Sequence, residues 1–464
     1  MLKVVVALSL AFVLGCFIPE TSEAQQSSNQ SAVRSPRLIA LEKLWESRDA
    51  AALDNFWREV KERGAPLVEP ISGDDKHVLV TFLWRGGNET RNVVAFSAFT
   101  TGHPCCSSYS ADQLAQGEMK RLLGTDVWFK TIRLPYDVRF TYYLSPNDSL
   151  VPDPQRTDKD WATQQPDPLN PHQFTLSHDH LFVASVVELP GAPPFPWFDE
   201  RPDVPKGRTE EHDLSSKALG DERHFWVYTP PGYTAGGEAY DLLVLIDGSA
   251  YAHMLHGLTI LDNLLAAGKI RPVIAVMLDP IDRAVELGCY ETFNDFLVRE
   301  LIPWAREHYH ITSNPDRIII GGQSLGGLAA AFAALRHPEV FGNVLSQSGG
   351  FSWDPQAPCG LEGCDAPPKV DEQDLQFEWI IRQFAGSPKL PIRFSLTVGR
   401  FEWQHKYPNM PSPLQSNRHM RDVLSAKGYT LAYKELPAGD ELFSVAVALP
   451  DSLSFLLNKD GTNK

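Results

Sequence analysis

The sequence predicts a small antiparallel β-sandwich followed by a mostly parallel β-sheet that carries helices on both faces. Residues 75–187 hold short apolar or alternating stretches separated by Gly, Asn, Asp and Pro, which is typical of antiparallel strands. In residues 207–464 apolar strands alternate with amphipathic helical stretches, which is typical of a parallel sheet covered on both sides. The proline-rich residues 188–206 cannot continue a helix or enter a central strand, so they are predicted to link the two parts.

The N-terminus is predicted to direct export. In residues 1–24 a lysine precedes the apolar run VVVALSLAFVLG, and SEA ending at Ala24 matches a small-x-small cleavage site. We expect cleavage after Ala24 and a periplasmic or secreted protein. Lipidation of Cys16, in VLGC, is the alternative and would give a lipoprotein. Residues 25–74 are expected to form a polar tether and then one or two amphipathic helices within 36–63.

Composition limits the classes of function. The 464-residue chain has a formal net charge of −16 at pH 7, which argues against a nucleic-acid partner. Beyond the N-terminal run, no stretch is long and apolar enough to span a bilayer, so no transmembrane segment is expected. The length favours two domains, and we expect a monomer.

Six cysteines bear on the chemistry of an exported protein. Cys359 and Cys364, in CGLEGC, are predicted to form a disulfide, since extracellular compartments are oxidising. No second Cys or His pair lies near them at zinc spacing, so a zinc site is disfavoured. The vicinal Cys105 and Cys106 are expected to pair with each other or with Cys289, and the sequence does not decide between these pairings.

The pentapeptide GQSLG at residues 322–326 lies between an apolar strand and an alanine-rich helix. This context is typical of the nucleophile elbow of an α/β-hydrolase, where a sharp turn exposes the serine and flanking glycines avoid steric clashes. Ser324 is therefore predicted to be a nucleophile. The N–H of Leu325 is expected to be one oxyanion-hole donor, and the N–H of Gly248 or Ser249, in the turn after LLVLID, the second.

The acid and the base of such a site follow the nucleophile in the chain. Glu402, just beyond the strand FSLTVG, is predicted to be the acid. A histidine is expected after the last strand, LAYKELP, but the last histidine of the chain is His419 and Asp440 stands in that loop. A carboxylate, with an ordinary pKa of about 4, is a weak base toward a serine hydroxyl. His405, in the loop after Glu402, is the candidate substitute, and direct action of Asp440 is the alternative.

Further motifs extend through both parts of the chain. They are GTDVW, PDPLNP, VVELPGAPPFPW, LLVLIDG, IDRAVELGC, ELIPWA, GGQSLGGLAA, HPEVFGNVLSQSG and SAKGYTLAYKELPAG. Together these segments resemble the enterochelin (ferric enterobactin) esterases. The resemblance implies hydrolysis of the serine trilactone of a catecholate siderophore, with Ser324 as nucleophile, Glu402 as acid and a histidine where this chain has Asp440. No cofactor is expected, because iron would enter only as part of the ferric substrate.

A ferric catecholate complex is anionic and aromatic, so its site would combine cations with aromatic rings. Arg283, Arg400 and Trp353 follow strands on the side where such sheets bind ligands, and they are predicted to contact the substrate. Two of them have a structural alternative. Arg283 could pair with Glu286, and Trp353 could pack under a loop.

Three functions fit these observations. The first is an exported serine esterase for a catecholate siderophore or a related ester, whose rate the missing histidine would lower. The second is a catalytically inactive homologue that binds a siderophore or another partner. The third is a carbohydrate or feruloyl-type esterase, because chains with a β-sandwich and a hydrolase also act on plant cell-wall esters. The retained elbow, oxyanion turn and acid favour the first function.

Overall fold

The computed structural model describes residues 34–102, 109–152, 155–175, 183–357, 371, 374–403, 409–439 and 441–458. The predicted signal peptide lies outside these residues. So do seven residues with predicted roles, namely Cys16, Cys105, Cys106, Cys359, Cys364, His405 and Asp440.

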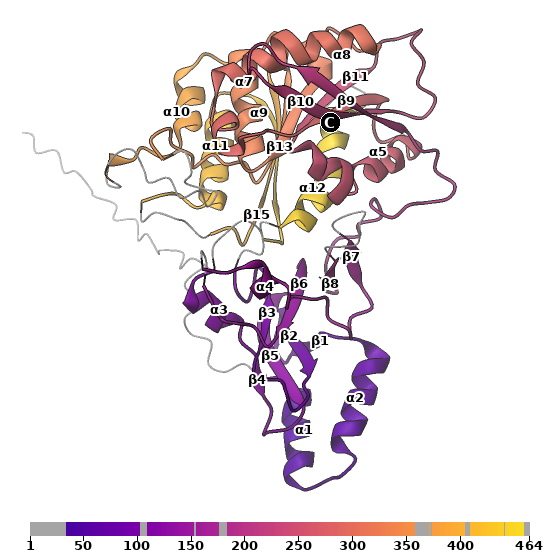
Figure 1. Ribbon diagram of the computed structural model, residues 1–464, viewed down its shortest axis with the longest axis vertical. Coiled ribbons are helices and arrows are strands. Elements are labelled where there is room, and N and C mark those ends of the chain that lie inside the picture. The colour runs from indigo at the N-terminus through magenta and orange to yellow at the C-terminus, as the bar shows by residue number, and fades with distance from the viewer. Residues whose placement is uncertain are drawn as a thin grey trace, which may run out of the picture. The chain divides into compact units, whose positions relative to one another are not determined.

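Two helices open the described part of the chain, as the amphipathic pattern predicted (Figure 1). α1 (Pro36–Glu46) begins at a proline, and the hydroxyl of Ser35 caps it by accepting a hydrogen bond from the Leu38 N–H at 3.2 Å. α2 (Ala52–Arg63) turns its apolar face toward the β-sandwich. The buried residues of that face include Phe56, Trp57 and Val60.

The β-sandwich consists of two four-stranded antiparallel sheets, with strand orders β1-β2-β5-β4 and β3-β6-β8-β7 (Figure 1). Phe82 of β2 packs against Phe140 and Tyr142 of β6, at centroid distances of 6.3 and 4.9 Å, so the two sheets share one core. The elements are β1 (Leu67–Ile71), β2 (Asp74–Arg85), β3 (Val93–Phe96), α3 (Ala111–Gly117), β4 (Lys120–Arg121), β5 (Val127–Pro135), β6 (Arg139–Pro146), α4 (Asp158–Trp161), β7 (Gln173–Thr175) and β8 (Val183–Glu188).

Strand β1 lies before residue 75, in the segment expected to hold only the tether and helices. Its side chains alternate between buried and exposed, but the buried set includes Glu69 and the strand contains Pro70, so apolar alternation does not mark it. The Glu69 carboxylate accepts hydrogen bonds from the Arg37 N–H at 3.0 Å and from the Ser35 hydroxyl. The buried charge of β1 therefore supports the start of α1.

The C-terminal part is built on one eight-stranded sheet, in the order β16-β15-β14-β13-β11-β12-β10-β9. The strands from β16 to β12 in this order pair in parallel, and β10 pairs antiparallel with both β12 and β9. The mostly parallel sheet of the predicted α/β-hydrolase is therefore confirmed. The strands are β9 (Arg208–Ser215), β10 (Glu222–Thr229), β11 (Asp241–Ile246), β12 (Val273–Leu278), β13 (Ile318–Gln323), β14 (Asn343–Gln347), β15 (Arg393–Gly399) and β16 (Thr430–Leu436).

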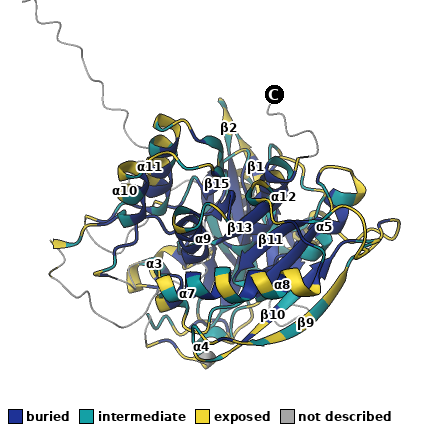
Figure 2. Ribbon diagram, turned by 90° about the horizontal axis from the view of Figure 1, so that it is seen from above, coloured by how far each residue is buried: buried dark blue, intermediate teal, exposed yellow. Residues whose placement is uncertain are grey.

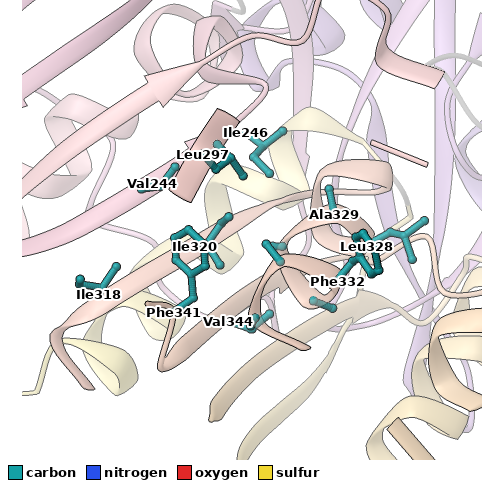
Figure 3. Packing of buried hydrophobic residues seen from close by; sticks show 14 of the residues in the cluster. Val244, Ile246, Leu297, Ile318, Ile320, Leu328, Ala329, Phe332, Phe341 and Val344 are labelled. Carbon is teal, nitrogen blue, oxygen red and sulfur yellow. The ribbon is translucent and has the colours of Figure 1, made fainter. Parts of the chain in front are cut away.

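Helices cover both faces of this sheet (Figure 2). Because side chains alternate along a strand, Val244 and Ile246 of β11 enter a core shared with α7 to α11, while Leu243 and Leu245 enter one shared with α5 and α12. Figure 3 shows the first core around Ile320 of β13. The helices are η2 (Ala250–Met254), α5 (Gly257–Ala266), α6 (Arg283–Glu286), α7 (Glu291–Phe296), η3 (Leu297–Leu301), α8 (Ile302–His308), η4 (Pro315–Arg317), α9 (Leu325–Arg336), α10 (Trp379–Gly386), α11 (Pro413–Ala426) and α12 (Leu442–Leu456).

The proline-rich segment between β8 and β9 is held against α5 by side chains of that helix. The Asn263 side-chain nitrogen donates to the carbonyls of Trp197 and Asp199 at 2.7 and 3.0 Å, and the Asp262 carboxylate accepts the Gly207 N–H at 2.9 Å. The described part of the chain contains no helix that is both long and apolar enough to cross a membrane.

Candidate active site

Ser324 lies at the junction of β13 and α9 with a φ of 51° and a ψ of −116°. A positive φ is unfavourable for a residue with a side chain and costs on the order of 1–3 kcal/mol, so the surrounding structure must impose it. The Ser324 N–H donates to the Gln347 carbonyl at 3.0 Å, and the Ser324 carbonyl accepts the Gly350 N–H at 2.8 Å. The half-buried serine thus lies in the strained turn expected of a nucleophile elbow.

The two glycines of the elbow allow a close approach of the backbone. A Cβ atom on Gly322 would lie 2.8 Å from the carbonyl carbon of Gly326, which is closer than real Cβ atoms approach other atoms. A Cβ atom on Gly326 would lie 3.1 Å from Oδ2 of Asp247. The spacing of glycines in the motif therefore follows from the geometry of the turn.

Glu402, the predicted acid, lies just after β15 and is 5% exposed. Its Oε1 accepts hydrogen bonds from the Ser348 hydroxyl at 2.7 Å and from the Gly399 N–H at 2.5 Å. A buried carboxylate is costly without such donors. Ser348 and Gly399 therefore supply hydrogen bonds that this buried carboxyl needs, and they fix its position.

The turn that follows β14 connects Ser324, the predicted nucleophile, to Glu402, the predicted acid. Gln347 and Gly350 bond to the backbone of Ser324, and Ser348, between them, donates to Glu402. Sequence reasoning missed Ser348. The available signal was its place in the polar run directly after a buried parallel strand, the edge at which such sheets carry their sites.

Gln347 also has a fixed side chain. Its Oε1 accepts the Tyr251 hydroxyl at 2.9 Å, and its Nε2 donates to the Val445 carbonyl at 2.7 Å. Burial, together with the negative charge of Asp247, raises the pKa of Tyr251, so its hydroxyl remains protonated and able to donate. Hydrogen bonds from η2 and to α12 therefore stabilise the turn that holds Ser324.

The proposed oxyanion donors lie at two strand ends. Leu325 is the first residue of α9, so its N–H is one of the initial N–H groups that have no acceptor within the helix. Gly248 follows β11, and a Cβ atom there would lie 2.2 Å from the Met277 backbone, so the position requires glycine. The Ser249 N–H already donates to Oδ1 of Asp279 at 2.9 Å, which favours Gly248 of the two candidates, and the oxyanion role itself stays a prediction.

Arg283, on α6, forms a two-pronged ion pair with Asp247, which precedes Gly248. The Nε–Oδ1 and Nη2–Oδ2 distances are 2.8 and 2.9 Å. Arg283 also lies 3.4 Å from the Gln323 carbonyl, which adjoins Ser324. Arg283 therefore lies beside the elbow, as predicted for a substrate contact, although its charge is already paired. Sequence reasoning missed Asp247, because DG after a strand is also a common turn.

The alternative pairing of Arg283 with Glu286 is wrong. The Glu286 carboxylate binds Arg223 of β10 at 2.7 and 3.0 Å instead. Arg223 is 2% exposed, so this pair is buried structure next to the site. The competing partner lay on a distant strand, which helical spacing could not indicate.

The other two predicted substrate contacts lie in different surroundings. Trp353 is 4% exposed and packs edge-on against Trp379 at 5.9 Å, so its ring is buried in the hydrophobic core, and the structural alternative was right that the ring packs but named only a loop. Arg400 donates to both carboxylate oxygens of Asp137, in the β-sandwich, at 2.8 and 3.0 Å. Contact of Trp353 or Arg400 with a substrate stays a prediction.

Cys289 is a free thiol, so the disulfide alternative that used this residue is not found. Burial raises the pKa of Cys289, which favours the protonated thiol. Among the residues that the structure describes, no group of three or more His, Cys, Asp or Glu side chains could hold a metal ion.

The roles of His405 and Asp440 remain predictions, because both residues lie outside the described part of the chain.

Both parts of the chain match families of known proteins. Residues 79–198 match the family "Enterochelin esterase, N-terminal", and residues 216–406 match the family "Putative esterase". The iron(III) enterobactin esterase of Dickeya dadantii is 32% identical over 440 residues, covering 89% of this chain and 95% of that protein. This chain belongs to the enterochelin esterase family.

Other members of the enterochelin esterase family agree with this assignment. The ferric enterobactin esterase of Salmonella typhimurium superposes with a TM-score of 0.67 at 26% identity, covering 87% of this chain and 98% of that one. The enterobactin esterase of Shigella flexneri, solved in the presence of enterobactin, gives 0.64 at 26% identity, covering 85% and 95%. The iron(III) salmochelin esterase of Escherichia coli is 27% identical over 363 residues, covering 76% and 83%. The resemblance found in the sequence is confirmed.

Proposed function

We propose that this member of the enterochelin esterase family hydrolyses the ester bonds of a catecholate siderophore, with Ser324 as the nucleophile. Family membership makes the chain a carboxylic ester hydrolase, and the relatives named above act on enterobactin or salmochelin. The observation that carries the proposal is the hydrogen-bond network in which the strained Ser324 and the buried Glu402 are held by the same turn.

In the proposed reaction the Ser324 hydroxyl oxygen attacks the ester carbonyl carbon while a base removes its proton. The N–H groups of Leu325 and Gly248 stabilise the negative charge that develops on the carbonyl oxygen. The base then gives the proton to the departing alkoxide. A water molecule repeats the attack on the acyl-serine and releases the acid product, and Glu402 orients the base and stabilises its charge.

We propose His405 as the base, because it lies three positions after Glu402 in the sequence and imidazole titrates near neutral pH. Asp440, where the family resemblance implies a histidine, is the alternative. Arg283 is the proposed contact for an anionic part of the substrate, since it lies beside the elbow. No cofactor is proposed, because iron is part of the ferric substrate.

A specific observation favours a second function. The family resemblance implies a histidine where this chain has Asp440, so the fold could retain a binding site for a siderophore after the chemistry is lost. Both functions predict binding of a catecholate, and only the first predicts cleavage that depends on Ser324.

One experiment separates the two functions. Purified protein is incubated with ferric and with iron-free enterobactin, and linear trimer and monomer are followed by chromatography beside Ser324→Ala. Cleavage that disappears in Ser324→Ala supports the esterase. Fluorescence quenching by the ferric complex without cleavage supports the binding protein, and failure of both excludes a catecholate ligand.

We also propose that the protein is exported by a signal peptide in residues 1–24 and acts as a monomer. Mass spectrometry of the mature protein tests the first point. A terminus at Gln25 indicates cleavage after Ala24, and a lipid-modified terminus at Cys16 indicates a lipoprotein. Retention of residues 1–24 would contradict both.

A further inference from the structure

Glu402 is the last residue of a short segment that leaves the end of β15. The two ends of this segment are held by the α/β part of the chain, since Oε1 of Glu402 accepts the N–H of Gly399 and the hydroxyl of Ser348. The side chains of the two residues between them, Arg400 and Phe401, contact the β-sandwich.

Both of these middle residues are anchored in the β-sandwich. Arg400 binds the carboxylate of Asp137, in the turn between β5 and β6. The Phe401 ring packs edge-on against Phe99 at a centroid distance of 4.7 Å, and Phe99 packs against Phe140 of β6 at 4.8 Å. The segment that carries the acid therefore inserts an aromatic ring at the margin of the sandwich core.

A second contact joins the sandwich to the start of α12. Glu441 precedes this helix and is 2% exposed, and its Oε2 accepts the N–H of Thr141 at 3.0 Å and the Thr141 hydroxyl. Thr141 is a buried residue of β6. The Glu441 carbonyl accepts the N–H groups of Ser444 and Val445, so the same residue fixes the first turn of the helix.

The two contacts are connected through the backbone. The Arg400 N–H donates to the Leu436 carbonyl at 2.8 Å, and the Phe401 N–H donates to the Ala438 carbonyl at 3.2 Å. A Cβ atom on Gly439 would lie 2.6 Å from Cβ of Ala98, in the sandwich. The segments after β15 and after β16 thus pair with each other, and both lie against the sandwich.

We propose that the N-terminal β-sandwich contributes positioning residues to the ester-hydrolysing site. Thr141, Asp137 and Phe99 position Glu402 and the chain at the start of α12. This inference rests on the proposed function of Ser324 and Glu402. These three residues touch no substrate in the proposed reaction and act through the segments that they hold.

The two polar contacts with the sandwich differ in expected importance. The Arg400 and Asp137 side chains are 37% and 44% exposed, so water and salt screen their attraction and the ion pair contributes little. The Glu441 carboxylate is buried and depends on its donors, because a desolvated charge is costly when a hydrogen bond is lost. Thr141 is therefore the residue whose change should have the largest effect.

The test compares two variants of Thr141 with a matched control. Thr141→Val removes the hydroxyl and keeps the shape and the backbone N–H, whereas Thr141→Ser keeps the hydroxyl. Thr81→Val is the control, because Thr81 is also buried in the sandwich and its hydroxyl pairs with Thr131 at 2.9 Å within the sandwich. The readouts are kcat and KM for enterobactin cleavage, and hydrogen exchange of the amides in residues 399–402 and 441–445.

We expect Thr141→Val to lower kcat about tenfold with KM changed by less than about twofold, because a hydrogen bond to a charged group is lost away from the substrate. Its amides in 399–402 and 441–445 should exchange faster than in the wild type. Thr141→Ser should restore most of kcat, and Thr81→Val should change neither readout. If Thr141 had only a structural role, Thr141→Val and Thr81→Val would both lose stability, and kcat would not differ between them.

The proposal would be overturned if Thr141→Val and Thr81→Val had the same kcat and the same hydrogen-exchange rates for the amides in residues 399–402 and 441–445. If the wild type cleaves no enterobactin, the proposed function fails, and the exchange measurement still decides the positioning role. If Thr141→Val does not fold, Asp137→Asn replaces it, because this exposed carboxyl can change without loss of the core. Unchanged exchange of residues 399–402 in Asp137→Asn would then count against the proposal.

Discussion

Ser348→Ala should weaken the positioning of Glu402, the proposed acid, without disturbing the elbow. The change removes one of the two donors to Oε1 of Glu402, the 2.7 Å bond from the hydroxyl, and leaves the bond from Gly399. A hydrogen bond to a charged group contributes about 1.5–3 kcal/mol, which corresponds to roughly 10- to 150-fold in rate when it is lost in the transition state. We therefore expect kcat/KM to fall by that factor and the free energy of unfolding to fall by about 1–3 kcal/mol.

Ser346→Ala is the matched control for this prediction. Ser346 is fully buried in β14, and its hydroxyl has no hydrogen-bond partner in the described part of the chain, so its loss should change kcat/KM by less than about twofold. The assay is steady-state cleavage of enterobactin by both variants, with urea unfolding of each. Ser348→Ala that matches Ser346→Ala in both measurements would refute the assignment of Ser348 as the residue that holds Glu402.

Three further predictions test other parts of the molecule. His405→Ala should lower kcat/KM by roughly a thousandfold or more if His405 is the base; a loss below tenfold, with a larger loss in Asp440→Asn, would transfer the role to Asp440. Gly248→Ala should lower the free energy of unfolding by about 3 kcal/mol or more in urea titrations, because its Cβ would meet the backbone of β12, whereas Gly236→Ala, with no atom within 4 Å, should change it by less than about 0.5 kcal/mol. Asp167 is buried in the stretch between α4 and β7 and accepts the Tyr142 hydroxyl at 2.7 Å. Burial raises the pKa of Asp167 above its ordinary value of 3.8, so the folded state retains this proton to higher pH than the unfolded state, and stability should fall as pH rises above that value. Asp167→Asn should lessen this fall in unfolding measured across pH, and an unchanged slope would contradict the burial effect.

Several features could be predicted because their signals are local or periodic. The elbow around Ser324 follows from glycine spacing between an apolar strand and a helix, and the placement of Glu402 follows from the end of a strand. The order of strands and helices follows from apolar periodicity. Strand β1 was not predicted because its buried side chains include Glu69, which breaks the apolar alternation. Glu69 is stabilised in the interior by hydrogen bonds from Ser35 and Arg37 at the start of α1.

Ion-pair partners that lie far apart in the sequence could not be predicted from local or periodic signals. The sequence suggested Glu286 for Arg283, because the two are neighbours on a helix, but the fold brings Asp247 to Arg283 and Arg223 to Glu286. Ion pairs form with whichever opposite charge the sheet places within about 4 Å, and sequence spacing carries no information about that distance.

The sequence by itself determined the family, the two-part architecture and the candidate nucleophile and acid of this protein, because each depends on a local motif or on the repeat of apolar residues. Only the tertiary structure decided that Ser348 holds Glu402, that Trp353 packs in the core, and that Arg400 and Glu441 contact the sandwich. These facts depend on which side chains meet after strands from distant positions align at one edge of the sheet, and that alignment exists only in the folded chain.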